Sequence, residues 1–367
     1  MSLQIGIVGL PNVGKSTLFN ALTRAGAAVA SYPFTTIDPN IGVVEVPDDR
    51  LAGVAAIVQP DEVKPTTIEF VDIAGLVQGA HRGEGLGNQF LGHIRNVDAV
   101  GLVVRCFEDP DVAHVTAELD PLADCDVIDL ELILADLQSV DRRIDKVQSA
   151  AKAQPKEYAA ELDVLGRLKT HLEGGRLAGQ LPLSGKEADL LEPLNLLTAK
   201  PRLYIANVSE GELPRGGPLA AQVIERAVEE GAEAVAICAQ LESDLADWPP
   251  EEAEEYRAEL GLEGSGLERL IHAGYRLLDL VTFFTATGTN VVRAWTLRRG
   301  QTVYEAAGKI HTDMQKGFIR AEVISYDGLL AAGDFARARE RGLVRLEGRD
   351  YLVQDGDVIH IRFSPPR

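Results

Sequence analysis

The sequence predicts an α/β protein in which a domain built on a parallel sheet is interrupted by a helical insertion and followed by a small α+β domain. Short apolar runs alternate with helical patterns over residues 1–125, a heptad-like spacing begins near Ile128, and short strands separated by turns return from Val281. Alternating strands and helices are typical of a parallel sheet, whereas a period of about 3.5 residues indicates helices packed on each other.

The composition is that of a soluble globular protein. Of the 367 residues, 46% are hydrophobic and 25% are charged, and the length suggests two or three domains. The 36 Lys and Arg residues are outnumbered by 56 Asp and Glu residues, so the formal net charge is −20. A chain this acidic is not a general polyanion binder, and we expect no DNA partner.

The cysteines and the apolar runs narrow the class further. The three cysteines, Cys106, Cys125 and Cys238, lie far apart without a CxxC pair, which disfavours a disulfide framework and a zinc site. No run of about 18 uncharged apolar residues is present, and the N-terminus lacks the pattern of a signal peptide. We therefore expect no membrane partner and a cytoplasmic location.

Four elements define the first domain. Apolar runs predict strands at Leu3–Val8, Thr67–Val71 and Ala99–Val104, and a helix is expected from Lys15 to Thr23. Each of these strands ends at residues that can carry chemistry. Because ligands bind at the carboxyl ends of parallel strands, we expect the functional site at that edge of the sheet.

A helical insertion follows. Its first helix carries apolar residues at alternating spacings of three and four, interrupted at Pro155, and a second amphipathic stretch comes next. Such stripes predict an antiparallel helical hairpin, and Ser184-Gly-Lys-Glu187 resembles a capping box that opens a third helix. The two predicted stripes are Leu130, Ile133, Leu137, Val140, Ile144 and Val147, and then Tyr158, Leu162, Leu165, Leu168 and Leu172.

The parallel sheet is expected to resume with strands at Arg202–Ala206 and Ala234–Cys238. Residues 209–263 contain 15 acidic and 3 basic residues, which predicts a solvated helical surface. The C-terminal pattern has strands at TFFTAT, VRAWTL, FIRAEVIS and YLVQDGDVIHIRF, with one helix at Val303–Ile310. The predicted domains are 1–125 with 200–280, the insertion 126–199, and 281–367.

The turn after the first strand predicts a phosphate site. The segment from Gly9 to Ser16, GLPNVGKS, fits the pattern GxxxxGK[ST] between a strand and a helix. Its glycines allow backbone N–H groups to wrap the α- and β-phosphates at a helix N-terminus. Lys15 can reach the β/γ oxygens, and the Ser16 hydroxyl can ligate Mg²⁺.

Two further segments complete this prediction. Asp72-Ile-Ala-Gly75 follows a strand, so Asp72 can hold the Mg²⁺ shell and the Gly75 N–H can contact a γ-phosphate. Between the two motifs, the Tyr32–Thr36 segment YPFTT offers a hydroxyl for Mg²⁺, with Thr36 as the candidate and Thr35 as the alternative.

The base-recognition segment leaves two nucleotides open. Proteins that select guanine usually present NKxD after a later strand, whereas here that place reads Asn207-Val-Ser-Glu210. Lys is absent and Glu replaces Asp, which puts the paired acceptor for guanine in doubt. The Asn207 amide, helped by the Val208 main chain, can instead pair with adenine N7 and N6; Glu210 as a guanine acceptor is the alternative.

Taken together, GLPNVGKST, YPFTT, FVDIAGLVQGAHRGEGLGNQFL, RCFEDPD, YIANVSE and AAGKIHTD…KGFIRAEVI…RDYLVQDGDVI resemble the YchF / Obg-like ATPase family over almost the full chain. The resemblance implies a GTPase-type P-loop domain of the TRAFAC class, a coiled-coil insertion and a β-grasp TGS domain. It also implies an Mg²⁺-dependent hydrolase that prefers ATP to GTP, associates with ribosomes and acts in translation or stress regulation. We expect a monomer.

The resemblance assigns roles by position. The phosphates would be enclosed by Asn12, Val13, Gly14, Lys15, Ser16 and Thr17, while Ser16 and Thr36 would serve Mg²⁺ and Asn207 with Val208 would face the base. The last base-contacting loop of the family corresponds to Cys238–Glu242. K⁺ is a candidate activator, because Asn12 resembles the asparagine of potassium-activated members of the wider class.

The residue after DxxG is Leu76, which cannot position a water by hydrogen bonding. Hydrolysis should therefore be slow alone or use a residue from elsewhere. His114, which matches a histidine of the family, is the first candidate, and His81 or Arg82 in the glycine-rich loop is the second.

Residues 282–367 carry a net charge of +3, in contrast to the rest of the chain. A basic face for ribosomal RNA is a hypothesis for this part; its candidates are Arg293, Arg298, Arg299, Lys309, Lys316 and Arg320. Three functions stay open: an ATPase switch on the ribosome, an Obg-type GTPase, and a nucleotide-binding module with negligible turnover.

Overall fold

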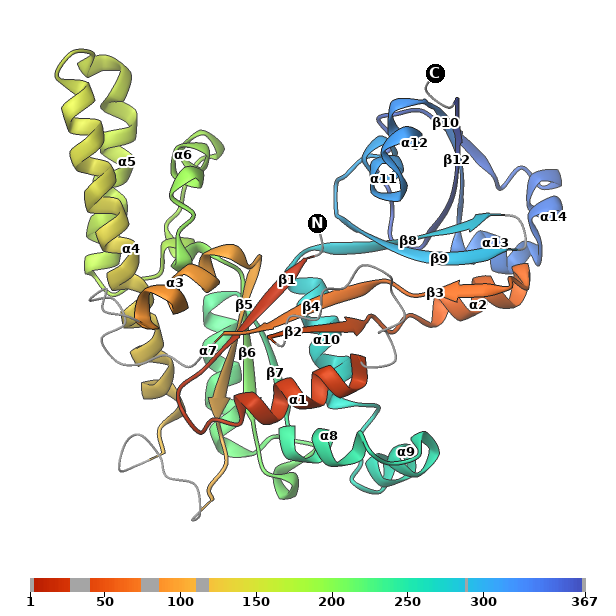
Figure 1. Cartoon of the computed structure of the whole chain (residues 1–367), viewed down its shortest axis with the longest axis horizontal. Helices are drawn as coiled ribbons and strands as arrows, with labels where there is room; N and C mark the ends of the chain where they lie inside the picture. The colour runs from red at the N-terminus through yellow and green to blue at the C-terminus, as the bar shows by residue number, and fades with distance from the viewer. Residues whose placement is uncertain (1–2, 27–39, 74–85, 110–118, 288–289, 365–367) are drawn as a thin grey trace. The chain divides into compact units, whose positions relative to one another are not determined.

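The computed structural model describes residues 3–26, 40–73, 86–109, 119–287 and 290–364 (Figure 1). The chain forms two compact units. The first unit combines Met1–Val44 with Glu69–Leu277, and the second combines Glu45–Ile68 with Leu278–Arg367. Each unit has its own six-stranded sheet.

The sheet of the first unit has the strand order β2-β4-β1-β5-β6-β7. Strand β1 pairs in parallel with β4 and β5, β5 pairs with β6, and β6 pairs with β7. The predicted strands and their parallel arrangement are thereby confirmed. The strands are β1 (Gln4–Val8), β2 (Ile41–Glu45), β4 (Thr67–Asp72), β5 (Ala99–Arg105), β6 (Arg202–Asn207) and β7 (Glu233–Ile237).

Central strands β5 and β6 are buried along their whole length. A strand covered on both faces must be apolar at consecutive positions, which explains the uninterrupted run AVGLVV in β5. Helices α7 and α10 pack on β6 and β7, and α1 packs on α8. Outside the helical insertion, the helices of the first unit are α1 (Lys15–Gly26), α3 (Leu86–Asn96), α7 (Gly217–Glu230), α8 (Ala239–Leu245), α9 (Pro250–Glu259) and α10 (Gly266–Leu277).

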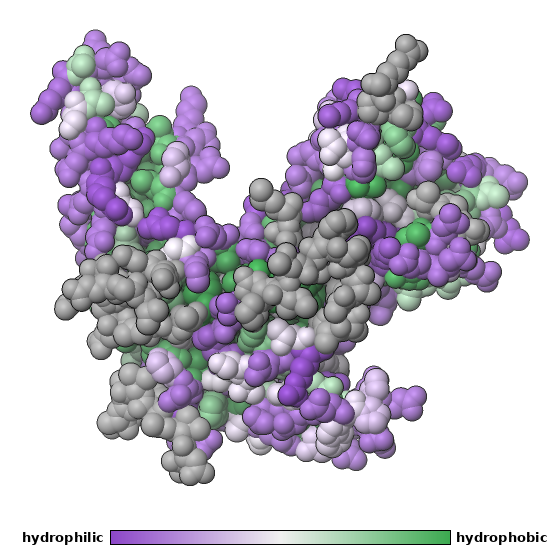
Figure 2. All heavy atoms as spheres, viewed as in Figure 1, coloured by the Kyte–Doolittle hydropathy of each residue, from purple (hydrophilic) through white to green (hydrophobic). Residues whose placement is uncertain are grey.

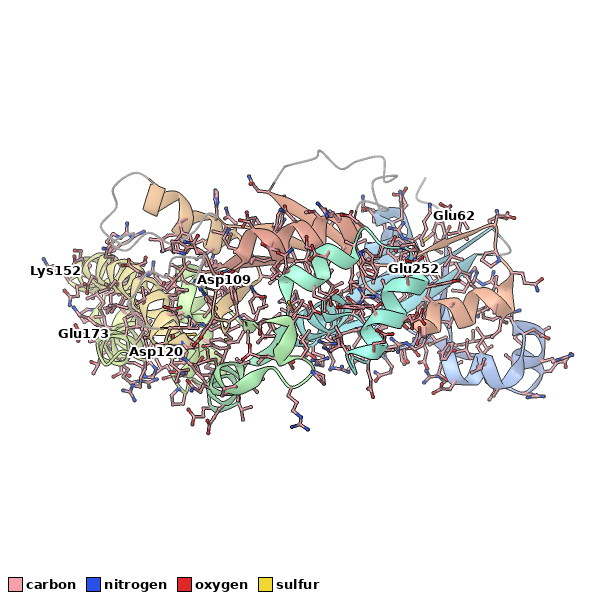
Figure 3. The ribbon with its side chains drawn as sticks, turned by 90° about the horizontal axis from the view of Figure 1, so that it is seen from below. Glu62, Asp109, Asp120, Lys152, Glu173 and Glu252 are labelled. Carbon is pink, nitrogen blue, oxygen red and sulfur yellow. The ribbon has the colours of Figure 1, made fainter. Side chains whose placement is uncertain are left out.

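The helical insertion is an antiparallel pair formed by α4 (Pro121–Ala151) and α5 (Pro155–Glu173), as predicted (Figure 1). The side chain of Asp120, which is labelled in Figure 3, precedes α4. It accepts hydrogen bonds from two N–H groups in the first turn of α4, which fixes the start of the helix. Hydrophilic side chains cover most of the hairpin on the face drawn in Figure 2.

The predicted seam of the hairpin is confirmed except at its first position. The core includes Ile133, Val140, Val147, Val164, Leu165, Leu168 and Leu172. Leu130, however, is 55% exposed, so its prediction as a seam residue is wrong. The physical reason is that α4 starts nine residues before Leu130. Its first turns pack against the sheet domain, where Cys125 and Ile128 are buried. The contact between α4 and α5 begins only after Leu130.

A short helical segment closes the insertion. Helix α6 (Gly185–Leu191) begins at the predicted capping box, in which Glu187 accepts from the Ser184 N–H at 2.8 Å. The buried carboxylate of Asp136 in α4 accepts from the backbone N–H groups of Leu197 and Thr198, both at 2.9 Å. These bonds tie α4 to the returning chain, which also forms η3 (Ala178–Gln180), η4 (Glu192–Leu194) and η5 (Leu197–Ala199).

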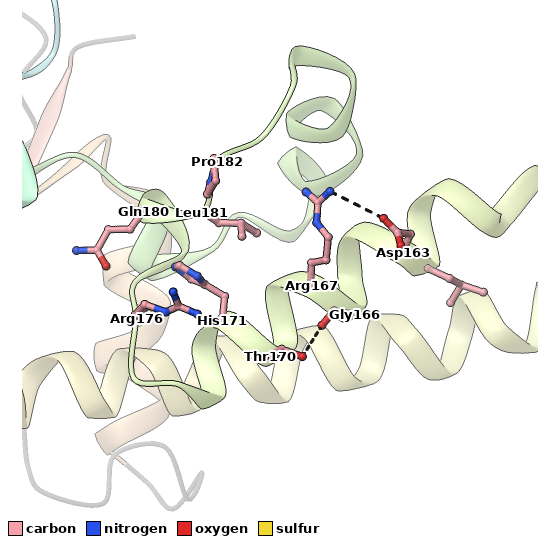
Figure 4. Close-up of a pocket in the computed structure, with 10 residues that line it drawn as sticks. Asp163, Gly166, Arg167, Thr170, His171, Arg176, Gln180, Leu181 and Pro182 are labelled. Carbon is pink, nitrogen blue, oxygen red and sulfur yellow. Dashed lines mark hydrogen bonds and ion pairs between the residues drawn. The ribbon is translucent and has the colours of Figure 1, made fainter.

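A groove of about 640 Å³ runs along α5 (Figure 4). Its polar lining is used within the insertion itself. Arg167 lies 2.7 Å from Glu187, and the buried His171 ring nitrogen Nε2 lies 3.0 Å from the Leu177 carbonyl oxygen. The polar groups of the groove therefore bind other residues of the insertion, where α5 packs against the segment that follows it.

A buried ion network joins α4 to the sheet. Asp129 receives Arg202 of β6 on one oxygen and Arg226 of α7 on the other, the latter at 2.6 Å. Arg226 also pairs with Asp126 at 2.6 Å and with Glu230 at 3.0 Å. Two arginines around one buried carboxylate satisfy its charge, so the base of the insertion is fixed to the domain that carries it.

The second unit has the strand order β11-β10-β12-β8-β9-β3. Its predicted strands and the helix Val303–Ile310 are confirmed, while one strand forms instead as two separate pieces, an isolated bridge at Leu352 and β12. The strands are β3 (Glu62–Lys64), β8 (Leu280–Thr287), β9 (Val291–Arg298), β10 (Phe318–Ser325), β11 (Arg345–Glu347) and β12 (Asp357–Phe363). The helices are α2 (Asp49–Val58), α11 (Val303–Ile310), α12 (Thr312–Lys316), α13 (Tyr326–Ala332) and α14 (Phe335–Glu340).

Residues 45–68 correct the predicted division of the chain, which placed them in the first domain. Strand β3 pairs in parallel with β9, and Arg50 forms an ion pair with Asp355 at 2.7 Å. Leu51 and Val54 of α2 are buried in the core of the second unit. Partners more than 200 residues away determine where this segment packs, and no local pattern indicates them.

None of the helices formed by the described residues combines the length and apolar character that crossing a membrane requires.

Candidate nucleotide-binding site

The turn between β1 and α1 has the backbone of a phosphate-binding loop. Asn12 and Gly14 both adopt left-handed conformations, with φ of +64° and +88°. A Cβ on Gly9 would lie 2.8 Å from the Val103 carbonyl oxygen, so only glycine fits there. Helix α1 starts at Lys15, and the loop therefore directs its N–H groups toward the carboxyl edge of the sheet.

Lys15 and Asp72 meet at this edge. Their side chains form a hydrogen-bonded ion pair, with 12% and 23% of the side-chain surface exposed. Asp72 ends β4 and is in register with Ile7 of β1. Two predicted site residues separated by 57 positions in the chain are thus brought together by the pairing of two neighbouring strands.

The donor set around this pair fits Mg²⁺. Ser16 is exposed in the first turn of α1, one residue after Lys15, and the Asp72 carboxylate is partly exposed. Hydroxyl and carboxylate oxygens are hard ligands of the kind that Mg²⁺ takes alongside phosphate oxygens. The described residues contain no group of three or more His, Cys, Asp or Glu side chains suited to a metal.

Asn207 ties the phosphate loop to the far side of the site. Its side chain is buried, donates from Nδ2 to the Val13 carbonyl oxygen at 2.9 Å, and accepts at Oδ1 from the Ala239 N–H at 3.0 Å. An amide nitrogen has two hydrogens, so one remains for a further acceptor. Sequence reasoning expected a base contact here and missed this bracing contact; the base contact stays a prediction.

The two residues predicted to accompany Asn207 differ in exposure. Val208 is buried, and its N–H donates to the Ile237 carbonyl oxygen of β7 at 2.9 Å. Glu210 is exposed at the start of the short helix η6 (Glu210–Glu212), where its Oε1 accepts from the Tyr256 hydroxyl at 2.6 Å. Tyr256 lies 46 positions later, and no motif in the sequence points to it.

In the Cys238–Glu242 segment, the side chains of Cys238 and Glu242 form hydrogen bonds that fix the starts of two helices. Cys238 caps α8 by accepting from the Leu241 N–H at 3.5 Å, and burial raises the pKa of its thiol. Glu242 is 3% exposed and accepts from the Ser265 hydroxyl at 2.8 Å and the Gly266 N–H at 2.6 Å, which fixes the start of α10. Glu242 is therefore an exception to the solvated acidic surface predicted for residues 209–263.

Several predicted residues lie outside the described part of the chain. These are Thr36 with its alternative Thr35, the γ-phosphate contact Gly75, and the residues considered for catalysis, Leu76, His81, Arg82 and His114.

A parallel sheet, a left-handed glycine before the helix and a lysine beside a strand-end aspartate define a P-loop nucleoside triphosphatase domain. Residues 4–149 match a family model described as 50S ribosome-binding GTPase. Residues 280–364 match the model YchF-GTPase_C, described as a protein of unknown function (DUF933).

Two bacterial relatives align with 99% of the chain. The chain is 52% identical to the ribosome-binding ATPase YchF of Bacillus subtilis (strain 168) over 366 residues, which covers 99% of this chain and 100% of that protein. It is also 52% identical to the protein of the same name from Haemophilus influenzae, with the same shares covered.

A solved structure of the Schizosaccharomyces pombe YchF GTPase superposes with a TM-score of 0.88 at 34% identity and covers 98% of both chains. The chain belongs to the YchF family.

Proposed function

We propose that the protein hydrolyses ATP in preference to GTP in an Mg²⁺-dependent reaction, and that its nucleotide state controls association with the ribosome. Two bacterial relatives carry the name ribosome-binding ATPase, whereas the fission yeast structure is called a GTPase. The choice of base therefore rests on this chain's own residues.

The bond between Glu210 and Tyr256 carries the ATP preference. A guanine-selecting carboxylate accepts from N1–H and from the 2-amino group, which requires both of its oxygens. In this chain the residue at that place gives one oxygen to the Tyr256 hydroxyl at 2.6 Å. A site with only one free oxygen cannot make the paired contact to N1–H and the 2-amino group, while Asn207 retains a hydrogen for N7 of the purine.

The phosphate roles follow from the loop. Residues Asn12 to Thr17 would enclose the α- and β-phosphates with backbone N–H groups, and Lys15 would turn from Asp72 to the β- and γ-phosphate oxygens. Ser16, Asp72 and Thr36 would hold Mg²⁺, which neutralises charge that develops on the phosphates. Gly75 would offer its N–H to the γ-phosphate.

His114 is our candidate for orienting the attacking water, because Leu76 cannot do so. The variant His114→Ala should slow single-turnover hydrolysis while leaving the dissociation constant for ATP nearly unchanged. Unchanged single-turnover hydrolysis would eliminate this role.

The contacts of α3 support a switch that reaches the insertion. This helix follows the DxxG segment, and Arg95 near its end donates to the Ser139 hydroxyl of α4 at 3.0 Å. Asn195 and Lys200 in turn donate to the Arg95 carbonyl oxygen at 2.9 and 3.1 Å. A change at the γ-phosphate would thus be transmitted through α3 to the helical insertion.

Ribosomal RNA is the proposed contact of the second unit. Of the basic candidates, Arg293 lies over the Trp295 ring at 4.0 Å and Arg299 pairs with Asp279 at 3.0 Å. Arg298, Lys309, Lys316 and Arg320 are exposed. If phosphate contacts hold the complex, its affinity should fall with added salt, and charge reversal at the exposed residues should weaken it. Affinity independent of salt would indicate protein contacts instead.

The first experiment measures dissociation constants for non-hydrolysable ATP and GTP analogues side by side, by calorimetry with Mg²⁺. ATP binding at least about tenfold tighter, worth about 1.4 kcal/mol, supports the adenine assignment. GTP binding tighter by that margin makes the protein an Obg-type GTPase with Glu210 as guanine acceptor. If ATP binds tightly but a separate assay of phosphate release from ATP shows negligible turnover, the protein is a nucleotide-binding module.

A further inference from the structure

We propose that Tyr256 is a specificity-determining positioning residue, which excludes GTP by holding the Glu210 carboxylate in a hydrogen bond. This inference rests on the proposed ATP preference and names the side chain that produces it. Without the Tyr256 hydroxyl, Glu210 would present both oxygens to the 2-amino and N1–H groups of guanine.

The backbone around Glu210 is fixed, so its side chain decides what the position offers. Ser209 donates from its N–H and its hydroxyl to Glu212, at 3.3 and 3.0 Å. The Leu213 N–H donates to the Glu210 carbonyl oxygen at 3.1 Å. Three residues earlier, Asn207 is braced against the phosphate loop and α8. The Glu210 carboxylate is therefore the part of the segment that can be redirected at little cost.

Tyr256 is held in place by a ring contact and by the anchoring of its helix α9. Its ring packs against Trp248, with centroids 5.5 Å apart and an interplanar angle of 51°. The next residue, Arg257, lies 3.4 Å from the buried Glu242 carboxylate, which anchors α9 to the start of α10. Glu252 in the first turn of α9 is labelled in Figure 3. The hydroxyl thus reaches Glu210 from an anchored helix, on a ring that has a packing partner.

The chemistry of the pair gives the bond a direction. Glu210 accepts and the phenol donates, and this bond raises the pKa of Tyr256, so the hydroxyl keeps its proton at neutral pH. A carboxylate bonded to a hydroxyl gains about what it would gain from one N–H of a base. Guanine would have to displace the hydroxyl before it could bond both carboxylate oxygens, whereas adenine has no 2-amino group to satisfy.

The test is Tyr256→Phe, which removes the hydroxyl and keeps the ring against Trp248. We expect the dissociation constant for the GTP analogue to fall about fivefold, equivalent to about 1 kcal/mol, with that for the ATP analogue unchanged within about twofold. Adding Glu210→Ala should abolish the gain. Tyr158→Phe, which removes a hydroxyl from the helical hairpin, should change neither constant and serves as the matched control.

The outcomes separate this inference from the proposed function. If the parent protein prefers ATP and Tyr256→Phe leaves GTP binding unchanged, the inference is wrong and the ATPase assignment stands. A gain that persists in the Glu210→Ala background would also overturn it, because the effect would not pass through Glu210. If the parent protein already prefers GTP, the proposed ATP preference fails, and the role of Tyr256 fails with it.

Discussion

Gly14 offers a sharp test of how the phosphate loop is held. The variant Gly14→Ala should destabilise the first unit and weaken ATP binding. The residue has a φ of +88°, and an added Cβ would lie 2.1 Å from Nδ2 of Asn207. No Cβ tolerates such an approach, and the amide cannot retreat without losing its bonds to Val13 and Ala239.

Two costs add up. An alanine in the left-handed region costs about 1 kcal/mol. Moving the Asn207 side chain breaks two buried hydrogen bonds of 2.9 and 3.0 Å, worth about 1 kcal/mol each. We therefore expect a loss of about 3 kcal/mol in the free energy of unfolding of the first unit. Gly175→Ala isolates the first cost, because Gly175 has a φ of +73° and nothing within 4 Å of its added Cβ; it should cost about 1 kcal/mol.

The two tryptophans make the assay specific to one unit. Trp248 lies in the first unit and Trp295 in the second, so urea unfolding followed by fluorescence in a Trp295→Phe background reports the first unit alone. In the double variant Gly14→Ala/Asn207→Ala the clash is gone, and its cost should fall short of the sum of the single costs by about 2 kcal/mol. Additive costs, or equal losses for Gly14→Ala and Gly175→Ala, would refute the reasoning.

Three further predictions follow from the same structure. Asp129→Ala should lower the stability of the first unit by about 3 kcal/mol in the fluorescence assay, because it leaves buried Arg202 without this carboxylate; a loss below about 1 kcal/mol would contradict it. The Ser184 N–H and hydroxyl, helped by Arg167, lower the pKa of Glu187 to about 2 from its usual 4.5. The cap of α6 should therefore be complete above pH 4.5 and be lost as the pH falls toward 2; a carboxyl chemical shift titrating near 4.5 would show that no such cap forms. If Asn12 helps to bind an activating K⁺, hydrolysis should be several-fold faster in KCl than in NaCl at matched ionic strength, and equal rates would remove this role.

The elements that sequence analysis located are those whose signals are local. The run Gln4–Val8, the glycine-rich turn and the start of α1 at Lys15 are specified by neighbouring residues, and so is the capping box at Ser184. Strand pairing then placed Asp72 beside Lys15, which the rule about strand ends had predicted.

The signals that sequence analysis missed are long-range. Strand β3 is three residues long and belongs to the second unit because it pairs with β9. Leu130 fits the heptad spacing but lies on α4 before the part of that helix that contacts α5. Tyr256 stands on a very acidic helix whose pattern indicates only solvent exposure, and its bond to Glu210 depends on how α9 folds back toward η6. None of these three placements can be predicted from the residues that neighbour it in the sequence.

The bracing role of Asn207 changes how its variants must be interpreted. Because the same amide holds the Val13 carbonyl and is predicted to face the base, a loss of ATP binding in Asn207→Ala does not by itself assign a base contact. Comparing ATP with tripolyphosphate, which has no base, separates the two roles. If the variant weakens both ligands equally, Asn207 acts through the phosphate loop alone. If the variant weakens the binding of ATP more than that of tripolyphosphate, the difference in binding free energy is the contribution of the base contact. The second hydrogen of the Asn207 amide then donates to the base.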